Sequence, residues 1–272
     1  MEKMIAYFSM EIGLETSLHT YAGGLGILAG DTLKSAADRG LPMVGVTLLH
    51  RKGYFRQVLD EEGRQTELPV DWSPDVALEM LPVKTKIVLE EREVVLRVWR
   101  YLIRGIDGEV PVYFLDTDCG ENDPGDRRLT DSLYGGNNFY RLKQEAVLGL
   151  GGIAVLRALG IRQVSTYHMN EGHSAFLTLA LLGERIQGSK ITPEGIEEVK
   201  QHCVFTTHTP VPAGHDQFPL EEVRRVLGEE MTGWIKELND SKVLNMTHLA
   251  LSFSRYINGV AMRHRQVSED MY

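Results

Sequence analysis

The feature that most constrains the fold of this chain is a repeated alternation of short apolar segments with longer amphipathic ones. Residues 5–8 (IAYF) and 43–49 (MVGVTLL) are nearly all apolar, as strands buried on both faces of a sheet are. Residues 25–39 lie between them, carry a rough apolar face at helical spacing, and end at Gly40. Strands that alternate with helices predict an α/β fold with a mostly parallel sheet and helices on both faces.

The same alternation continues to the second half of the chain. Further buried strands are expected at residues 112–115, 164–167 and 203–207. Helices are expected at residues 140–159, 174–186, 193–200, 220–227 and 235–242. Thr192 stands before Pro193, which is the order of an N-cap and a first helical residue.

The middle of the chain follows another pattern. Residues 94–101 (VVLRVWRY) partly alternate apolar and polar side chains, which indicates half-exposed antiparallel hairpins. No repeat, low-complexity tract or linker interrupts the sequence. We therefore expect one domain over residues 1–272, with a β-rich insertion at about 53–110.

Composition narrows the class of partner and the compartment. With 43% hydrophobic residues the chain can build a large core, and its formal net charge of −9, without a basic cluster, argues against nucleic acid. Its longest apolar stretch, residues 146–160, contains Arg157 and is too short to span a bilayer. The two cysteines, Cys119 and Cys203, are too few for a disulfide framework. A cytoplasmic protein with a neutral polymer or small molecule as ligand is expected.

Ligands of open parallel sheets bind outside the carboxyl ends of the strands, so the loops after the expected strands deserve inspection. The first such loop contains Glu11 and ends in Gly23, Gly24 and Leu25 at the start of a helix. Consecutive glycines there let backbone N–H groups approach an anion such as phosphate, although Gly23-Gly24 also suits a simple tight turn.

Two further loops carry amides and a carboxylate. Asn137 and Asn138 follow a Gly-Gly pair and suit either sugar hydroxyls or plain turn formation. Asn170 and Glu171, in the segment YHMNEGHSAF at 167–176, suit a hydroxyl-rich ligand or a helix cap. His173 stands five residues after His168, whereas the helical metal motif needs a spacing of four, so no metal site is expected.

The fourth loop, TTHTPVPAGHDQ at 206–217, holds His208 and His215 on either side of Pro210 and Pro212. A spacing of seven across two prolines excludes a shared helix face. The prolines stiffen the loop, so it can present backbone groups to a ligand at low entropic cost. Spacing alone favours structural histidines.

These motifs together resemble one family, the α-glucan phosphorylases (glycogen, starch and maltodextrin phosphorylases), in the short bacterial and archaeal form. The resemblance begins at IAYFSMEIGLE (5–15) and includes YAGGLGILAGD (21–31), VYFLDTDCGENDPGDRRLTDSLYGG (112–136) and RLKQEAVLGLGG (141–152). It continues through YHMNEGHSAF and FTTHTPVPAGHDQFP to NGVAMRH (258–264) and SEDMY (268–272). Nearly the whole chain is covered, and the order is that of the family's N-terminal domain.

The resemblance implies a Rossmann-like domain that forms the N-terminal half of a GT-B fold. Such enzymes transfer the terminal glucose of an α-1,4-glucan to phosphate and give α-D-glucose 1-phosphate, with pyridoxal 5′-phosphate as cofactor. The family's attachment lysine comes from a C-terminal domain, and nothing in these 272 residues is similar to that domain. The resemblance therefore implies a chain that is inactive alone and needs the C-terminal domain as a partner, in cis or in trans; a homo-oligomer stays open.

The resemblance also assigns roles to individual residues. Gly23, Gly24 and Leu25 match the loop that offers N–H groups to the phosphates. Glu11 and His208 match catalytic-site positions, with the backbone carbonyl of His208 facing the glucosyl unit. The expected substrate-binding residues are Asn170, Glu171, His173, Asn137 and Asn138.

Two other functions stay open at this point. The chain could be a glucan-binding or regulatory module without chemistry of its own. A nucleotide-sugar glucosyltransferase shares the GT-B plan, but such enzymes typically carry a lysine just before the first Gly-Gly. Here Tyr21 and Ala22 occupy those positions, which argues against this function.

Overall fold

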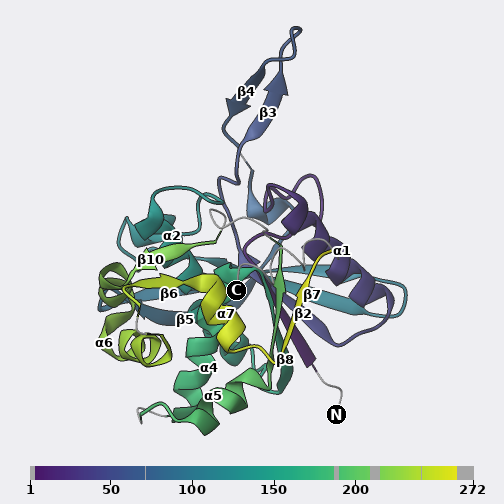
Figure 1. Cartoon of the computed structure of the whole chain (residues 1–272). Helices are drawn as coiled ribbons and strands as arrows, with labels where there is room; N and C mark the ends of the chain where they lie inside the picture. The colour runs from purple at the N-terminus through teal and green to yellow at the C-terminus, as the bar shows by residue number, and fades with distance from the viewer. Residues whose placement is uncertain (1–3, 71, 187–189, 209–214, 240, 262–272) are drawn as a thin grey trace.

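The computed structural model describes residues 4–70, 72–186, 190–208, 215–239 and 241–261. An eight-stranded sheet in the order β12-β9-β8-β1-β2-β7-β6-β5 forms its centre (Figure 1). The strands are β1 (Met4–Ser9), β2 (Met43–Leu48), β5 (Glu79–Leu89), β6 (Arg92–Arg104), β7 (Glu109–Asp116), β8 (Val164–Asn170), β9 (Cys203–Thr207) and β12 (Tyr256–Gly259). The strands from β12 to β7 pair in parallel, while β6 and β5 pair antiparallel. The predicted mostly parallel α/β sheet is confirmed.

Both faces of the sheet are covered at its central strands β1, β2 and β7, which explains why these strands are mostly apolar. In β1, Ala6 and Phe8 pack into one core cluster and Tyr7 packs into a second cluster on the opposite face. In β7, Leu115 belongs to the first cluster and Phe114 to the second. Successive strand residues point to opposite faces, so a strand covered twice needs apolar side chains at every position.

Different helices cover the two faces. Helix α1 (Gly24–Asp38) packs against β2, β6 and β7 within the second cluster. The first cluster is closed by α2 (Asn138–Ala146), the π-helix η3 (Val147–Gly151), α3 (Gly152–Ala158) and α4 (Phe176–Ile186). The long helix expected at 140–159 therefore exists, but a π-helical turn interrupts it.

Glycines allow this interrupted helix to lie close to its neighbours. A Cβ atom at Gly149 would lie 2.6 Å from the backbone nitrogen of Leu177. A Cβ atom at Gly152 would lie 2.4 Å from the ring of Phe8 in β1. The apolar run at 146–160 is thus a core helix, and no helix within the described ranges is long and apolar enough to cross a membrane.

The β-rich middle segment divides into two parts. Strands β3 (Arg56–Leu59) and β4 (Gln65–Leu68) form a hairpin that projects away from the body, at the top of Figure 1. The longer strands β5 and β6 extend the main sheet beyond β7. The antiparallel character expected at residues 94–101 is confirmed, and these strands are an integral part of the sheet.

The remaining elements are short or lie outside the main sheet. They are η1 (Pro74–Val76), η2 (Asp126–Arg128), η4 (Gly172–Ser174), α5 (Pro193–Lys200), β10 (Gln217–Pro219), α6 (Leu220–Leu238), β11 (Val243–Asn245) and α7 (Met246–Ser252). Helix α6 packs against α2 and β5. Thr192 caps α5 as predicted, since its hydroxyl accepts a hydrogen bond from the N–H of Gly195. The helix expected at 235–242 is wrong in its bounds, because α6 continues to Leu238 past a break at Gly228, where φ is 82°.

Candidate functional site

The polar loops after the parallel strands meet around one cavity. Glu11 follows β1, Asn170 ends β8 and His208 follows β9, and these strands are neighbours in the sheet. The cavity has a volume of about 640 Å³. Its lining residues are Gly24, Leu25, Leu28, Tyr134, Arg141, His173, His208 and Val260. The position at the carboxyl ends of parallel strands is the one expected for a ligand site.

Asn170 joins the ends of three strands. Its buried amide nitrogen donates to Ser9 Oγ at 2.9 Å, and Ser9 Oγ donates to the carbonyl of Glu11 at 2.6 Å. On the other side, Asn170 Oδ1 lies 2.5 Å from Nε2 of His208. Because the amide oxygen can only accept, the proton of the His208 ring is assigned to Nε2.

Glu171 fixes the backbone next to the cavity. Its Oε2 accepts a hydrogen bond from the N–H of His208 at 2.7 Å, and its Oε1 accepts from the N–H of Gly172 at 3.2 Å. Glu171 also has a φ of 72°, a conformation that is rare and strained for a residue with a side chain. The carboxylate therefore caps η4 and positions His208, and its role in binding a sugar stays a prediction.

Glu11 holds the glycine turn and an aromatic ring together. Its Oε2 accepts from the N–H groups of Ala22 at 2.6 Å and Gly23 at 3.1 Å. Its Oε1 accepts from the hydroxyl of Tyr134 at 2.8 Å. Burial and the adjacent Glu11 raise the pKa of Tyr134 well above its ordinary value. Glu11 thus acts by positioning in this structure, and its catalytic role stays a prediction.

The glycines at the start of α1 serve two different purposes. A Cβ at Gly26 would lie 2.5 Å from Cβ of Tyr21, and one at Gly30 would lie 1.8 Å from the carbonyl oxygen of Gly13, so close packing requires both glycines. A Cβ at Gly23 or Gly24 would meet nothing within 4 Å. Neither of these two has a positive φ. Packing within the described chain therefore does not explain Gly23 and Gly24, and their expected contact with a phosphate stays a prediction.

Asn137 and Asn138 lie outside the lining of the cavity. Asn137 is the N-cap of α2, where its side chain accepts from the N–H of Tyr140 at 3.0 Å, and Asn138 is the first residue of that helix. Both side chains are exposed. The turn-forming alternative describes Asn137 well, and the geometry lends no support to direct ligand binding by either residue.

Sequence reasoning missed two cavity residues that lie near these asparagines. Tyr134 precedes the glycine pair, and Arg141 stands in the first half of α2 with its guanidinium 5.3 Å from the ring centre of Tyr134. The sequence shows an aromatic residue and an arginine within eight residues of the glycine pair, in a loop that we had already considered as a ligand site. Both residues could have been proposed on that ground. Arg141 brings the positive charge that the other loops lack.

His173 contacts the same arginine through an aspartate. Its Nε2 lies 3.4 Å from Oδ2 of Asp216, and Arg141 also pairs with Oδ2 of Asp216. Burial lowers the pKa of His173 to about 4, an effect that Asp216 only partly offsets. His173 is therefore neutral at physiological pH and lines the cavity as a hydrogen-bonding ring.

The other histidines of these loops have structural contacts. His215 is buried and its Nδ1 lies 2.7 Å from the hydroxyl of Thr247, while Nε2 of His168 lies 2.7 Å from the hydroxyl of Thr206. Pro210 and Pro212, expected to stiffen the loop, lie outside the described residues. Among the residues that are described, no group of histidines, cysteines and carboxylates could hold a metal ion.

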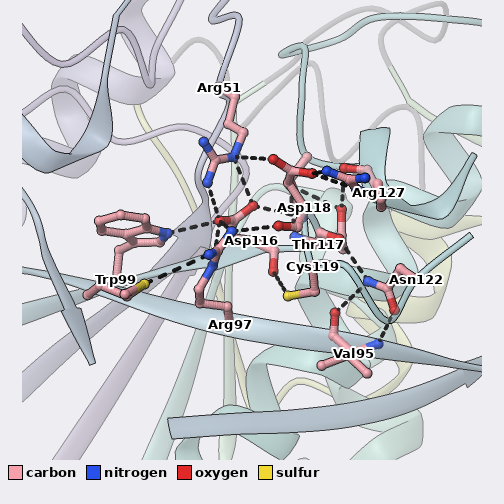
Figure 2. Close-up of polar contacts among 12 residues, drawn as sticks. Arg51, Val95, Arg97, Trp99, Asp116, Thr117, Asp118, Cys119, Asn122 and Arg127 are labelled. Carbon is pink, nitrogen blue, oxygen red and sulfur yellow. Dashed lines mark hydrogen bonds and ion pairs between the residues drawn. The ribbon is translucent and has the colours of Figure 1, made fainter. Parts of the chain in front are cut away.

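An ionic network around Asp116 connects β6, β7 and the loop after β2 (Figure 2). The side chain of Asp116, at the end of β7, is fully buried and pairs with Arg51 and Arg97 at 2.6 and 3.0 Å. Trp99 Nε1 donates to the same carboxylate at 2.9 Å. Burial alone would raise the pKa of Asp116, but the hydrogen bonds from Arg51 and Trp99 outweigh burial and hold this pKa below its ordinary value.

The network extends to the backbone near the cavity. The backbone N–H of Arg51 donates to the carbonyl of Thr130 at 3.0 Å, and that of Leu133 donates to the carbonyl of Gly53 at 2.8 Å. Asn122 further ties the loop to β6 through both backbone groups of Val95. The polar loop after β7 is thereby held in place, and Tyr134 follows directly from its last anchored residue.

Fold and site together define a class: an α/β protein with a cavity at the carboxyl ends of its parallel strands, where such proteins bind ligands. The chain is 38% identical, over its whole length, to the maltodextrin phosphorylase of Thermococcus litoralis. It is 38% identical over 98% of its length to the glycogen phosphorylase of Mycobacterium tuberculosis, and 32% identical over its whole length to that of Aquifex aeolicus. No family model matches the chain. The chain is thus related to the α-glucan phosphorylases, as its motifs predict.

The similarities cover a larger share of this chain than of its relatives. They cover this chain almost completely, but the chain spans only 34% of the Thermococcus and Mycobacterium proteins and 41% of the Aquifex protein. A further relative, an uncharacterized protein of Methanocaldococcus jannaschii, is 33% identical and is covered over half of its length. These similarities therefore do not by themselves assign the activity of a whole phosphorylase to this chain.

Proposed function

We propose that this chain supplies one wall of the catalytic cleft of an α-glucan phosphorylase. In this proposal the enzyme transfers the terminal glucosyl unit of an α-1,4-glucan to phosphate and gives α-D-glucose 1-phosphate. The opposite wall of a GT-B cleft, with the lysine that carries pyridoxal phosphate, comes from another part of the protein or another chain. The carrying observation is that Gly24, His173 and His208, which the family resemblance connects with phosphate and sugar, line one cavity.

The residues present fit one end of the proposed cofactor and not the other. Open space in front of Gly23 and Gly24, at the N-terminus of a helix, suits a phosphate group. No lysine is found among the described residues that line the cavity, so an aldehyde has no attachment point there. When bound, pyridoxal phosphate supplies a phosphate that exchanges a proton with the substrate phosphate.

The chain's own residues have distinct tasks in this proposal. The first turn of α1 donates N–H groups to a phosphate, and Glu11 holds that turn in position. Glu171 accepts a hydrogen bond from the backbone N–H of His208, and Asn170 accepts one from its ring. These two contacts fix the carbonyl of His208 beside the glucosyl unit. A fixed dipole stabilises the positive charge that develops on the sugar in the transition state, since it needs no reorganisation. Tyr134 and Leu28 give the cavity part of its apolar lining.

Reconstitution tests the proposal directly. The chain is mixed with the segment of the Thermococcus litoralis maltodextrin phosphorylase that lies outside the matched third, together with pyridoxal phosphate, phosphate and a maltooligosaccharide. Formation of glucose 1-phosphate that requires both proteins supports the proposal. A well-formed complex that binds glucan without turnover contradicts it and favours a glucan-binding module.

A binding experiment on the chain alone gives the second arm. Arg141 is the cation of the cavity, and it is already paired with Asp216. The isolated chain is therefore expected to bind a maltooligosaccharide weakly and phosphate more weakly still, without turnover. Calorimetry with each ligand separately measures both affinities. The control variant Gly120→Ala should bind both ligands as the unmodified chain does, because Gly120, like Gly24, faces open space but does not line the cavity.

A further inference from the structure

One carboxyl group beside the cavity stands apart from the contacts described above. Glu145 lies in the last turn of α2 and is fully buried. No donor group of the described residues reaches either of its carboxyl oxygens, while the carboxylate of Asp216 lies within hydrogen-bonding reach of the Glu145 side chain. Buried polar atoms without a partner are rare in folded proteins, and a carboxylate that is buried without a donor is strongly disfavoured. The state of Glu145 therefore needs a physical explanation.

The charges around Glu145 favour its neutral form. Burial raises the pKa of Glu145 well above its ordinary value, and the neighbouring carboxylate of Asp216 raises it further. Arg141, four residues earlier on the same helix, acts in the opposite direction but is engaged with Asp216. Lys143 is turned elsewhere, since it pairs with Glu90 at 3.1 Å. Among the described residues, Arg141 is the cation that acts on Glu145, and it is shared with Asp216.

We propose that Glu145 is kept as a neutral carboxylic acid and acts as a positioning residue, whose O–H holds Asp216 against Arg141 and His173. Two of these three partners line the cavity, so Glu145 acts on the ligand site without touching the ligand. The identity of that ligand rests on the function proposed above, but the proton on Glu145 does not.

Charge balance supports this arrangement. With Glu145 neutral, the group formed by the buried Glu145 and His173 and the partly buried Asp216 and Arg141 has one positive and one negative charge. With Glu145 ionised, two carboxylates, one of them fully buried, would share one guanidinium. Like charges at close range raise the pKa of one member of the pair until it keeps its proton. The backbone of Asp216 cannot easily move away, because its carbonyl accepts from the N–H of Met246 at 3.0 Å.

The arrangement also sets the tautomer of His173. If Asp216 is ionised, the Nε2 of His173 that faces it at 3.4 Å carries the ring proton. The Nδ1 atom is then an acceptor, and it is buried without a partner among the described residues. A ring fixed in this tautomer accepts a hydrogen bond from a hydroxyl group and cannot donate one.

The first experiment looks for the proton itself. Infrared spectra at pH 7 are recorded for the unmodified chain, for Glu145→Gln and, as a control, for Glu121→Gln. Glu121 is exposed, and its hydrogen bond from Lys84 lowers its pKa, so it contributes only carboxylate bands. A carboxylic-acid C=O band that disappears in Glu145→Gln but persists in Glu121→Gln supports the proposal. The absence of such a band in the unmodified chain overturns it.

The second experiment reads the positioning role. The ring nitrogens of His173 are followed by NMR in the unmodified chain, in Glu145→Gln, whose amide still donates to Asp216, and in Glu145→Leu. We expect a single Nε2-protonated tautomer in the first two and a mixture of tautomers in Glu145→Leu. The same tautomer in all three proteins would contradict the positioning role. If Glu145→Leu does not fold, the infrared band and Glu145→Gln still decide the protonation state.

Ligand binding separates this inference from the proposed function. Glu145→Leu is expected to weaken maltooligosaccharide binding about tenfold, and Glu145→Gln to restore it to within about twofold. If neither the unmodified chain nor any variant binds the sugar, the proposed function fails, while the infrared and NMR results still stand. If Glu145→Gln and Glu145→Leu bind equally well, the positioning role fails and the proposed function is unaffected.

Discussion

Oε2 of Glu171 accepts a hydrogen bond of 2.7 Å from the backbone N–H of His208 and so ties the loop after β8 to the loop after β9. The two residues are 37 positions apart in the chain. Asn170 adds a second link to the ring of His208. The position of His208 at the cavity is therefore set by two neighbouring side chains of the adjacent strand end.

The first prediction concerns this link. Glu171→Ala removes the acceptor of a charge-assisted hydrogen bond and should lower the free energy of unfolding by about 2 kcal/mol. It should also weaken maltooligosaccharide binding, because the backbone of His208 loses its anchor. Urea unfolding and calorimetry measure the two effects. Glu61→Ala, on the exposed tip of the β3–β4 hairpin, is the control and should change neither; equal effects of the two variants would refute the anchoring role.

The second prediction separates the two kinds of glycine at α1. Gly26→Ala should destabilise the protein by about 1–3 kcal/mol, since its Cβ would come within 2.7 Å of Oε2 of Glu11. Gly24→Ala places its methyl group in open space and should leave stability unchanged within about 0.5 kcal/mol. It should nevertheless weaken binding of a phosphate-bearing ligand such as pyridoxal phosphate in the reconstituted complex. Unchanged binding by the Gly24→Ala complex would remove the glycine turn from the site.

The third prediction is a loss of stability in mild acid. Burial lowers the pKa values of His50, His168 and His173 to about 4, so between roughly pH 6.5 and pH 4.5 the unfolded chain binds protons that the folded chain does not. Stability therefore decreases as the pH falls through this window, by about 1.4 kcal/mol per pH unit for each histidine. Glu145 offsets the destabilising effect of one of the three histidines, because its raised pKa keeps a proton in the folded state that the unfolded state has released.

The measurement for this prediction is urea unfolding at pH 7.5 and pH 5.0. His50→Gln should reduce the acid-induced loss, since His50 is fully buried and lies outside the cavity lining. Glu145→Gln should increase the loss, because it removes the opposing group. If stability is the same at both pH values, the three histidines are not buried in their neutral form.

The fourth prediction tests the network of Figure 2. Asp116→Asn leaves Arg51 and Arg97 without their buried partner and should cost about 3 kcal/mol or more. Trp99 reports the change locally through its fluorescence, because it donates to Asp116. The control Asp123→Asn removes an exposed ion pair with Arg92 and should cost less than about 1 kcal/mol. A small effect of Asp116→Asn would mean that the loop carrying Tyr134 is held by other contacts.

The strands and helices with strong periodicity were predictable from the sequence. Residues 203–207 form β9 as expected, and the helix expected at residues 25–39 is α1 (Gly24–Asp38) within one residue. Short elements were missed, including β10 (Gln217–Pro219) and β12 (Tyr256–Gly259). Three or four residues carry too little periodicity to show a strand, and β12 is defined mainly by its pairing with β9.

The candidate site was predictable in its location and less so in its contacts. The rule for parallel sheets places Gly24, Asn170 and His208 at one edge, and the structure brings them together. Residue type alone did not reveal that Glu11 and Glu171 are occupied by backbone N–H groups of other loops. Arg141 reaches Asp216 across 75 positions of the chain, and Tyr134 reaches Glu11 across 123, which are contacts that no local pattern encodes.

The most direct test of the central claim is a map of backbone amide shifts in this chain on titration with a maltooligosaccharide. The claim is that loops after three neighbouring strands form one sugar-binding cavity. We predict that the amide signals of Gly24, Asn170, His173 and His208 shift together along a single binding curve. Shifts confined to another surface, such as the hollow around Arg162 and His202, with these four signals unchanged, would contradict the account.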